Sequence, residues 1–232
     1  TGGLVKESAI EPGPDLRLVL QDAILLAARW ETPFLKGNTS QRPFTLADGN
    51  QVTTQTMSAT QAVAFAEADG WTAIRLPYRQ GRLHADLVLP PPAVDPASIP
   101  ATILAKLTKS LDATEPAGIE LTLPTLDLKP EPLNLLPTLA GLAPSALCGA
   151  DDTDFSGMGP EALCVQQAVQ QAVLTLDEDG TKAAAVTEVA MAASGMAEPA
   201  RQFHLDRPFL LQIGDTATSW PLFLAAVRDP RH

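Results

Sequence analysis

The stretch from Thr181 to Met191 alternates with a period of two residues, and this alternation constrains the fold more than any other feature of the chain. Its two charges, Lys182 and Glu188, fall on the same face of an extended chain. A period of two is that of a β-strand, in which successive side chains point to opposite faces. The other face is small or apolar throughout and carries Thr181, Ala183, Ala185, Thr187, Val189 and Met191. The pattern therefore predicts a strand with one face to be buried.

The flanks of this stretch are typical of an exposed segment. Asp179-Gly180 is a turn signal on one side, and residues 192–200, AASGMAEPA, have the composition of a loop on the other. A helix is the alternative, because Ala, Lys, Glu and Met are strong helix formers. The residues alone leave open a strand that awaits a partner sheet and an Ala-rich helix.

The first half of the chain predicts a β-rich fold. Residues 15–30 carry a long apolar run, typical of a central strand that is buried on both faces of its sheet. The Asp-Gly pair at 48–49 is a hairpin signal between two short strands. Turn signals at 69–70 and 80–81 divide residues 62–90 into three short strands, which predicts a meander.

A few helices are predicted among these strands. Ile103, Leu104, Leu107 and Leu111 recur at helical spacing and predict a surface helix, with Ser98 near its start. The second half of the chain predicts six further elements. They are a strand at 119–128, a short helix at 133–142 interrupted by Pro137, an acidic loop at 151–158 anchored by Phe155 and Met158, a long strand at 161–178, and two final strands within 207–227.

The charge balance bears on the partners of the chain. The formal net charge is -11 at pH 7, and the 16 Lys and Arg residues form no basic cluster of the kind that binds a phosphate backbone. No apolar run reaches the roughly 18 residues that a membrane span needs. We therefore expect neither nucleic acid nor a membrane among the partners.

Two cysteines, Cys148 and Cys164, are too few for a disulfide framework. We expect both to be buried free thiols, with a single bridge between them as the alternative.

Catalytic and metal-binding patterns are weak. LDEDGT at 176–181 has the opening of a calcium loop, but the third ligand position and the closing Glu are not in place. His84, His204 and His232 lie far apart in the sequence and have no metal-ligand spacing. The hydrolase pattern GxSxG is absent. We expect no enzymatic activity, no metal and no cofactor.

The segment VLTLDEDGTKAAAVTEVAM, residues 173–191, resembles the hinge of the serpins, in which a Glu, a Gly, a Thr or Ser and a run of Ala lead from a central strand into the reactive-centre loop. Further blocks resemble successive serpin segments in the same order along the chain. They are residues 18–34, 42–49, 66–78, 121–128, 154–158, 203–213 and 221–230.

This resemblance implies an α+β fold of the serpin class, with a large central β-sheet, further barrel-like sheets and flanking helices. Residues 1–232 then correspond to the C-terminal part of a single serpin domain, with the reactive-centre loop at about 178–204 and the N-terminal helical part absent. The Ala-rich, Lys-poor composition predicts a bacterial source of high genomic GC content. We expect an extracellular rather than a cytoplasmic location, because secretion suits defence against external proteases.

The resemblance also implies a function. A serpin offers its loop to a serine or cysteine protease, is cleaved, and traps the protease as an acyl-enzyme while the severed loop inserts into the main sheet. The implied partners are that protease and, if it is carried separately, the N-terminal part of the same serpin. The alternative is a non-inhibitory serpin, or an inert fragment, that acts as a binding or structural module.

Hinge roles are carried over residue by residue. Glu178 and Gly180 would form the pivot, and Thr181 would enter the sheet first, because a small side chain lowers the barrier to opening it. Lys182 departs from the Glu that is common in the family, but it lies on the outward face. The residues whose small size suits rapid insertion are Ala183, Ala184, Ala185 and Val186.

The scissile bond follows from the family's spacing. Sixteen residues beyond Glu178 lies Ser194, which places the cut before Gly195. Loop length varies by two or three residues in the family, which brings in the neighbours Met191, Ala193 and Met196. None of these side chains is basic, so the implied target is elastase-like or subtilisin-like and not trypsin-like.

Two further places are implied to control sheet opening. Trp30 matches the tryptophan at the breach, the top of the sheet where insertion begins. Asp22 and Gln170 stand where serpins commonly pair an Asn with a His to hold the central strands together at the shutter. The Asp carboxylate can accept a hydrogen bond from the Gln amide.

Overall fold

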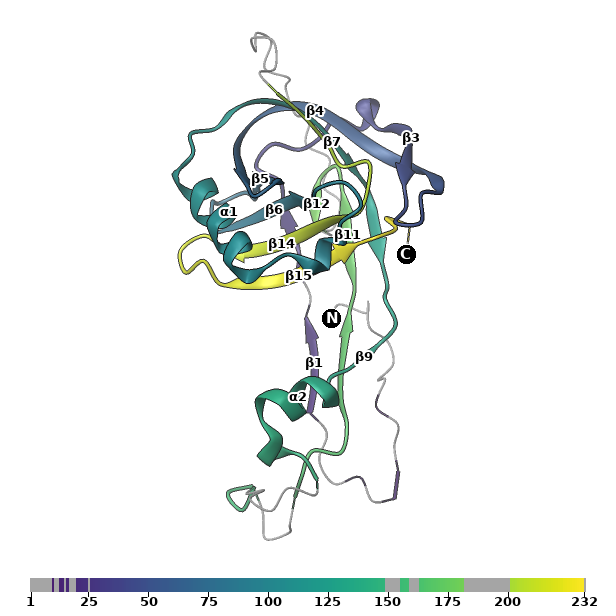
Figure 1. Cartoon of the computed structure of the whole chain (residues 1–232), viewed down its shortest axis with the longest axis vertical. Coiled ribbons are helices and arrows are strands. Elements are labelled where there is room, and N and C mark those ends of the chain that lie inside the picture. Colours follow the sequence, from purple (N-terminus) through teal and green to yellow (C-terminus); the bar gives the residue numbers. More distant parts are fainter. Residues whose placement is uncertain are drawn as a thin grey trace. The chain divides into compact units, whose positions relative to one another are not determined.

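The computed structural model contains two compact units, which are coloured along the sequence in Figure 1. Unit 1 is formed by residues 1–25 with 129–173, and unit 2 by residues 26–128 with 174–232. The residues that the structure describes are 10, 13–14, 16, 20–24, 26–148, 155–158, 163–181 and 201–231.

Unit 2 contains an eight-stranded sheet with the order β13-β7-β4-β5-β6-β14-β15, in which β3 also pairs with β4 (Figure 1). Its strands are β3 (Ser40–Thr45), β4 (Gln51–Ala68), β5 (Trp71–Pro77), β6 (Leu83–Leu89), β7 (Ala117–Pro124), β13 (Arg201–His204), β14 (Phe209–Asp215) and β15 (Pro221–Val227).

The predicted hairpin and meander are confirmed. The Asp-Gly pair at 48–49 joins β3 to β4, and the turns at 69–70 and 80–81 join β4 to β5 and β5 to β6. One difference is the length of β4, which runs for 18 residues where two short strands were predicted. The first part of β4 pairs with β3 and β7, and its last part pairs with β5. A single uninterrupted strand therefore joins the part of the sheet that contains β7 to the part that contains β5.

The predicted surface helix is α1 (Ala101–Ala113), and its buried residues Ile103, Leu107 and Leu111 pack with Trp71 and Val88 of the sheet. The helix is N-capped by Pro100, and Ser98 lies instead in the preceding 3-10 turn η2 (Pro96–Ser98). A second 3-10 turn, η1 (Lys36–Asn38), precedes β3. The larger core of unit 2 includes the fully buried Phe44, Met57, Ile74, Leu87, Leu121 and Phe209.

Two further sheets account for the remaining strands. Unit 2 has a four-stranded sheet with the order β2-β12-β11-β8, formed by β2 (Ala28–Arg29), β12 (Gly180–Thr181), β11 (Leu174–Asp177) and β8 (Leu126–Leu128). Unit 1 has a three-stranded sheet with the order β1-β10-β9, formed by β1 (Leu20–Ile24), β10 (Ala168–Ala172) and β9 (Leu133–Asn134). Unit 1 also holds η3 (Pro144–Ala146) and α2 (Leu136–Leu142). The predicted short helix is thus present, but it begins at Leu136 because Leu133–Asn134 form β9, and Pro137 lies in its first turn and does not interrupt it.

The two long strands predicted at 15–30 and 161–178 are therefore each divided in two. The first becomes β1 and β2, and the second becomes β10 and β11 after residues 163–167, which belong to no strand. The apolar runs do not predict these breaks. The sequence pattern of buried residues is the same for one continuous strand and for two strands in succession.

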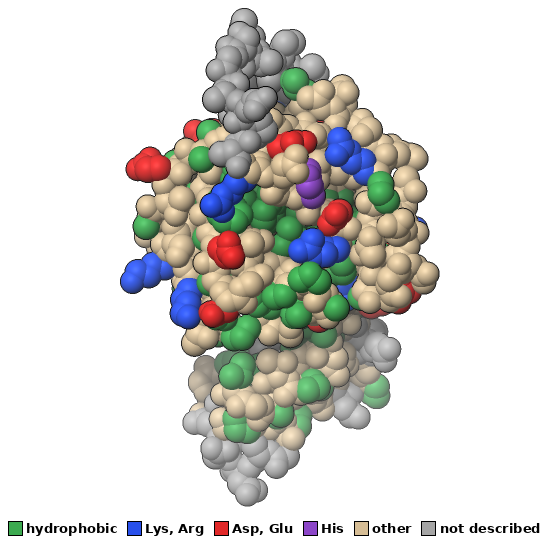
Figure 2. Space-filling model, turned by 45° about the horizontal axis from the view of Figure 1, so that its top comes forward, with side chains coloured by type: hydrophobic (Ala, Val, Ile, Leu, Met, Phe, Trp, Pro, Cys, Tyr) green, Lys and Arg blue, Asp and Glu red, His purple; other side chains and the backbone are tan. Residues whose placement is uncertain are grey.

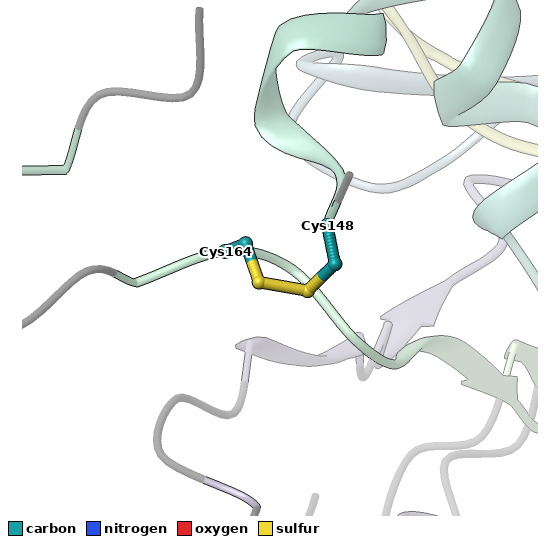
Figure 3. The surroundings of a disulfide bond; sticks show 2 residues. All are labelled: Cys148 and Cys164. Atoms are coloured by element: carbon teal, nitrogen blue, oxygen red, sulfur yellow. A yellow bond between two sulfur atoms is a disulfide. The ribbon is translucent and has the colours of Figure 1, made fainter. Parts of the chain in front are cut away.

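Cys148 and Cys164 form a disulfide in unit 1, so the expectation of free thiols is wrong (Figure 3). Their Cα atoms lie 4.9 Å apart. The neighbouring residues Leu147 and Val165 form an isolated β-bridge, and the Val165 N–H donates to the Ala146 carbonyl at 2.9 Å. This backbone contact brings the two cysteines together. No local sequence pattern predicts the contact.

The prediction that Met158 anchors the loop at 151–158 is also wrong. Met158 is 60% exposed, whereas Phe155 is half-buried. The Met158 N–H donates to the Phe155 carbonyl at 2.8 Å, so a tight turn separates the two side chains.

The surface carries charges of both signs. On the face in Figure 2, Lys and Arg side chains alternate with Asp and Glu across the described residues. Across the described part of the chain, the structure contains no helix that is long and apolar enough to cross a membrane.

A buried group of charged residues ties β5, β6 and α1 together. The Arg75 guanidinium donates to both oxygens of Asp86 at 2.7 and 2.8 Å, and it also contacts Asp112 of α1. His84, which is 4% exposed, places Nε2 3.6 Å from Asp86 and Nδ1 3.2 Å from the Thr216 hydroxyl. Burial lowers the pKa of His84, although the charge of Asp86 acts in the opposite direction.

We predict that His84 makes the protein less stable as the pH falls. Because the folded state holds the pKa of His84 below that of the unfolded chain, the unfolded chain binds the proton more readily. Below a pH of about 6.5 the free energy of unfolding should drop by up to about 1.4 kcal/mol per pH unit. Urea unfolding of the wild type and His84→Gln between pH 7.5 and 5.5 measures this.

The variant should show a flatter pH dependence than the wild type over that window. His204→Gln removes one imidazole from a half-buried position and serves as the matched control. Equal slopes for the wild type and His84→Gln would contradict the assignment.

Candidate functional site

Gly180 and Thr181, which the family resemblance assigns to a hinge, form a two-residue strand, β12, inside the four-stranded sheet of unit 2 (Figure 1). β12 pairs antiparallel with β11 on one side and with β2 on the other. Thr181 is opposite Leu176 of β11 and Ala28 of β2. The first residues of the loop segment are therefore already a central part of a sheet.

The turn between β11 and β12 is closed by Asp177. Its Oδ1 accepts hydrogen bonds from the backbone N–H groups of Asp179 at 2.9 Å and Gly180 at 3.2 Å. A short side chain that binds the backbone two and three residues ahead is a common means of fixing a tight turn. The chain is thereby directed back between β11 and β2.

Only glycine fits at position 180. Its φ angle is +147°, which side chains with a Cβ rarely adopt. A Cβ there would lie 2.2 Å from the Ala28 carbonyl oxygen and 2.7 Å from the Arg29 Cα. Both contacts are with backbone atoms of β2, so a neighbouring side chain cannot relieve them by rotating.

Thr181 points into a buried aromatic site. Its side chain is 1% exposed, and its Oγ1 lies 2.5 Å from the hydroxyl of Tyr78. The Tyr78 ring stacks on Trp30 with 4.5 Å between ring centroids, and the Trp30 Nε1–H donates to the Asp177 carbonyl at 3.0 Å. Burial raises the pKa of Tyr78, so its phenol keeps its proton at neutral pH.

A segment after β2 holds the outer side of the turn. The Thr39 hydroxyl donates to Glu178 Oε1 at 2.6 Å, and the Phe34 N–H donates to the Glu178 carbonyl at 2.9 Å. The Trp30 N–H donates to the Asp179 carbonyl at 3.0 Å. Lys36 and Asp179 also approach to 3.5 Å, but both are exposed, and such pairs contribute little.

In unit 1, β1 and β10 pair directly as parallel neighbours over residues 20–24 and 168–172. No other strand therefore lies between these two segments. Asp22 is opposite Gln170 in this register. The backbone positions are those of a facing pair, and the hydrogen bond between the two side chains stays a prediction.

The structure gathers four of the predicted residues, Trp30, Glu178, Gly180 and Thr181, at one place in unit 2. Other predicted site residues lie outside the described residues. They are Ala183, Ala184, Ala185, Val186, Met191, Ala193, Ser194, Gly195 and Met196.

Sequence reasoning missed Tyr78 and Thr39. Tyr78 is the one tyrosine of the chain, and it directly follows a predicted strand. Its position in the sequence does not predict which distant residue its hydroxyl contacts. Across the described part of the chain, no group of three or more His, Cys, Asp or Glu residues is placed to hold a metal ion.

Comparison with known proteins agrees with this fold. The family model described as Serpin (serine protease inhibitor) matches residues 1–230. The matched family is one of serine protease inhibitors by its description, and the chain belongs to it: it is a member of the serpin family.

Curated relatives cover nearly the whole chain. Plasminogen activator inhibitor 1 from Neovison vison is 30% identical over 222 residues, which are 92% of this chain and 54% of the relative. An uncharacterized serpin-like protein from Methanosarcina acetivorans is 28% identical over 96% of this chain and 52% of its own length. Leukocyte elastase inhibitor A from Mus musculus is 29% identical over 92% and 59%. The chain thus spans between half and three fifths of the length of these relatives.

Solved structures show the same fold. The thermophilic serpin tengpin in its native state superposes with a TM-score of 0.80 at 24% identity, over 99% of this chain and 60% of that one. A serpin from the trematode Schistosoma haematobium gives a TM-score of 0.74 at 24% identity, over 90% and 55%. The α+β serpin architecture predicted from the sequence is confirmed.

We predict that Gly180→Ala expels β12 from the sheet, because its Cβ would collide with the backbone of β2. Hydrogen exchange of the peptide covering residues 174–181, followed by mass spectrometry, should then become markedly faster. Gly37→Ala is the matched control, since a Cβ at Gly37 would meet no atom within 4 Å. Unchanged exchange in Gly180→Ala would show that the hinge tolerates a side chain at this position.

Proposed function

We propose that residues 1–232 are the C-terminal part of one serpin domain and inhibit a protease as a suicide substrate, with the reactive-centre loop at about 178–204. The single observation that carries this proposal is β12. Gly180 and Thr181 occupy a place between β2 and β11, whereas β1 and β10 are paired directly. A sheet that already contains the first two residues of this segment between two strands supports an inhibitor that takes up its loop as a further strand.

The strand registers support insertion of the following residues. Thr181 is opposite Ala28 and Leu176. Beyond this pair, the alternation from Ala183 to Met191 keeps small or apolar residues on the face that Thr181 occupies, as a strand that lengthens β12 requires.

Insertion would be downhill in free energy. About ten new backbone hydrogen bonds, at a net value of about 1 kcal/mol each, amount to roughly 10 kcal/mol. Burial of the small face from Ala183 to Met191 adds to this. The uncleaved protein would be kinetically trapped, because the intact loop cannot reach into the sheet.

The side chains around the proposed bond between Ser194 and Gly195 define the target. Ser194 and its neighbours Met191, Ala193 and Met196 are small or unbranched and carry no charge. A protease with a small or apolar primary pocket, elastase-like or subtilisin-like, fits them. One relative, from Mus musculus, is named a leukocyte elastase inhibitor.

A second candidate function is that of a binding or structural module without inhibitory activity. The Cys148–Cys164 disulfide supports an extracellular location in either case, because disulfides persist in oxidising compartments.

Incubation with elastase or subtilisin tests the proposal. We expect a covalent complex that survives denaturing electrophoresis, together with cleavage near Ser194. Active-site-blocked protease is the control and should give no complex. Cleavage without a covalent complex would reject inhibition and favour the module.

The alternation of the hinge gives a sharper test with a matched pair. Ala183→Arg places a charge on the face that would be buried, so insertion should slow and most of the protein should be cleaved as a substrate. Ala184→Arg places the same charge on the opposite face and should still trap the protease. The ratio of complex to cleaved protein on a gel measures both, and equal ratios would contradict insertion in this register.

A further inference from the structure

The hydroxyls of Thr181 and Tyr78 form a buried pair. One belongs to a very short strand and the other is attached to a large sheet. Each residue is 1% exposed, and the hydroxyl oxygens lie 2.5 Å apart. Thr181 belongs to the two-residue strand β12, which carries the loop. Tyr78 follows β5 directly, so it is joined to the eight-stranded sheet.

The position of Tyr78 is fixed from several sides. Its N–H donates to the Leu83 carbonyl at 3.0 Å, it forms a β-bridge with Trp30, and its ring stacks on the same tryptophan. The hydroxyl is thus presented by a rigid support at the point where β12 ends. A rigid hydrogen-bonding partner loses little conformational freedom when the hinge docks against it.

The pair stabilises the docked hinge only while both hydroxyls are present. A buried hydroxyl without a partner is costly, whereas replacing both partners by apolar groups of similar shape is nearly neutral. When β12 leaves the sheet, the Thr181 hydroxyl regains water. Removal of one hydroxyl therefore favours the expelled hinge more than removal of both.

We propose that the Tyr78 hydroxyl is a latch that holds Thr181 in the sheet before any loop bond is cut, and that this latch sets how often a protease is trapped rather than released. This inference rests on the proposed inhibitory function. Tyr78 is a positioning residue, because it acts on the protease only through the hinge.

The direction of the effect follows from the order of events. With β12 docked, the sheet is already open at the point where insertion starts. An expelled hinge must first separate β2 from β11, which leaves more time for hydrolysis of the acyl-enzyme. Weakening the latch therefore raises the number of inhibitor molecules consumed for each protease trapped.

The first arm of the test needs no protease. We expect Tyr78→Phe and Thr181→Val each to speed hydrogen exchange of residues 174–181 by about tenfold, as one hydroxyl is left buried without a partner. The double variant should exchange more slowly than the product of the two single effects predicts. Thr181→Ser keeps the hydroxyl and should stay close to the wild type. Exchange of β7, residues 117–124, should be unchanged in all variants and serves as the control for folding.

The second arm counts inhibitor molecules consumed per protease trapped, with elastase or subtilisin. Tyr78→Phe and Thr181→Val should each raise this number. Thr181→Ser, which keeps a hydroxyl, should give the wild-type number. Wild-type exchange rates in Tyr78→Phe, or single effects that simply multiply in the double variant, would overturn the latch. If the wild type forms no covalent complex, the proposed function fails, while the exchange data still decide whether Tyr78 holds the hinge.

Discussion

The backbone pairing of two residues, Gly180 and Thr181, between β2 and β11 is the interaction on which the site depends. It gives the inner edges of both strands a hydrogen-bonding partner, and buried backbone groups nearly always have one. It also requires glycine at position 180, because the backbone of β2 leaves no room for a Cβ. The same pairing brings Thr181 to Tyr78 and Glu178 to Thr39.

β2 is itself only two residues long, and it relies on the larger sheet of unit 2. The Arg79 N–H donates to the Arg29 carbonyl at 2.7 Å, and the Glu31 N–H donates to the Pro77 carbonyl at 2.9 Å. β2 is thereby attached to the end of β5, which pairs along its length with β4 and β6. One side of the β12 site is therefore built on an extensively paired sheet, whereas β12 itself is a strand of two residues. Local stability differs between such elements, and the proposed insertion of the loop would draw on that difference.

Patterns that repeat within a few residues could be read from the sequence. The hairpin at Asp48-Gly49 and the apolar face of α1 both follow from the chemistry of neighbouring residues. The family resemblance supplied the hinge and identified Trp30, which lies beside it in the structure.

Features that join distant residues could not be read in this way. The Cys148–Cys164 bridge depends on a backbone contact between Leu147 and Val165. The partnership of Tyr78 with Thr181 spans 103 positions, and no local pattern encodes it. The division of the two long apolar runs into β1 with β2 and β10 with β11 is set by which neighbours offer hydrogen bonds, which hydrophobicity does not reveal.

The stacking of Trp30 on Tyr78 has an optical consequence. The indole is 1% exposed, and its N–H is bonded to the carbonyl of Asp177, one of the residues of the turn that leads into β12. Departure of the hinge would change the polarity and the ring contacts of this chromophore at once. The intrinsic fluorescence of Trp30 would therefore report the proposed departure of β12 in real time, without any attached dye.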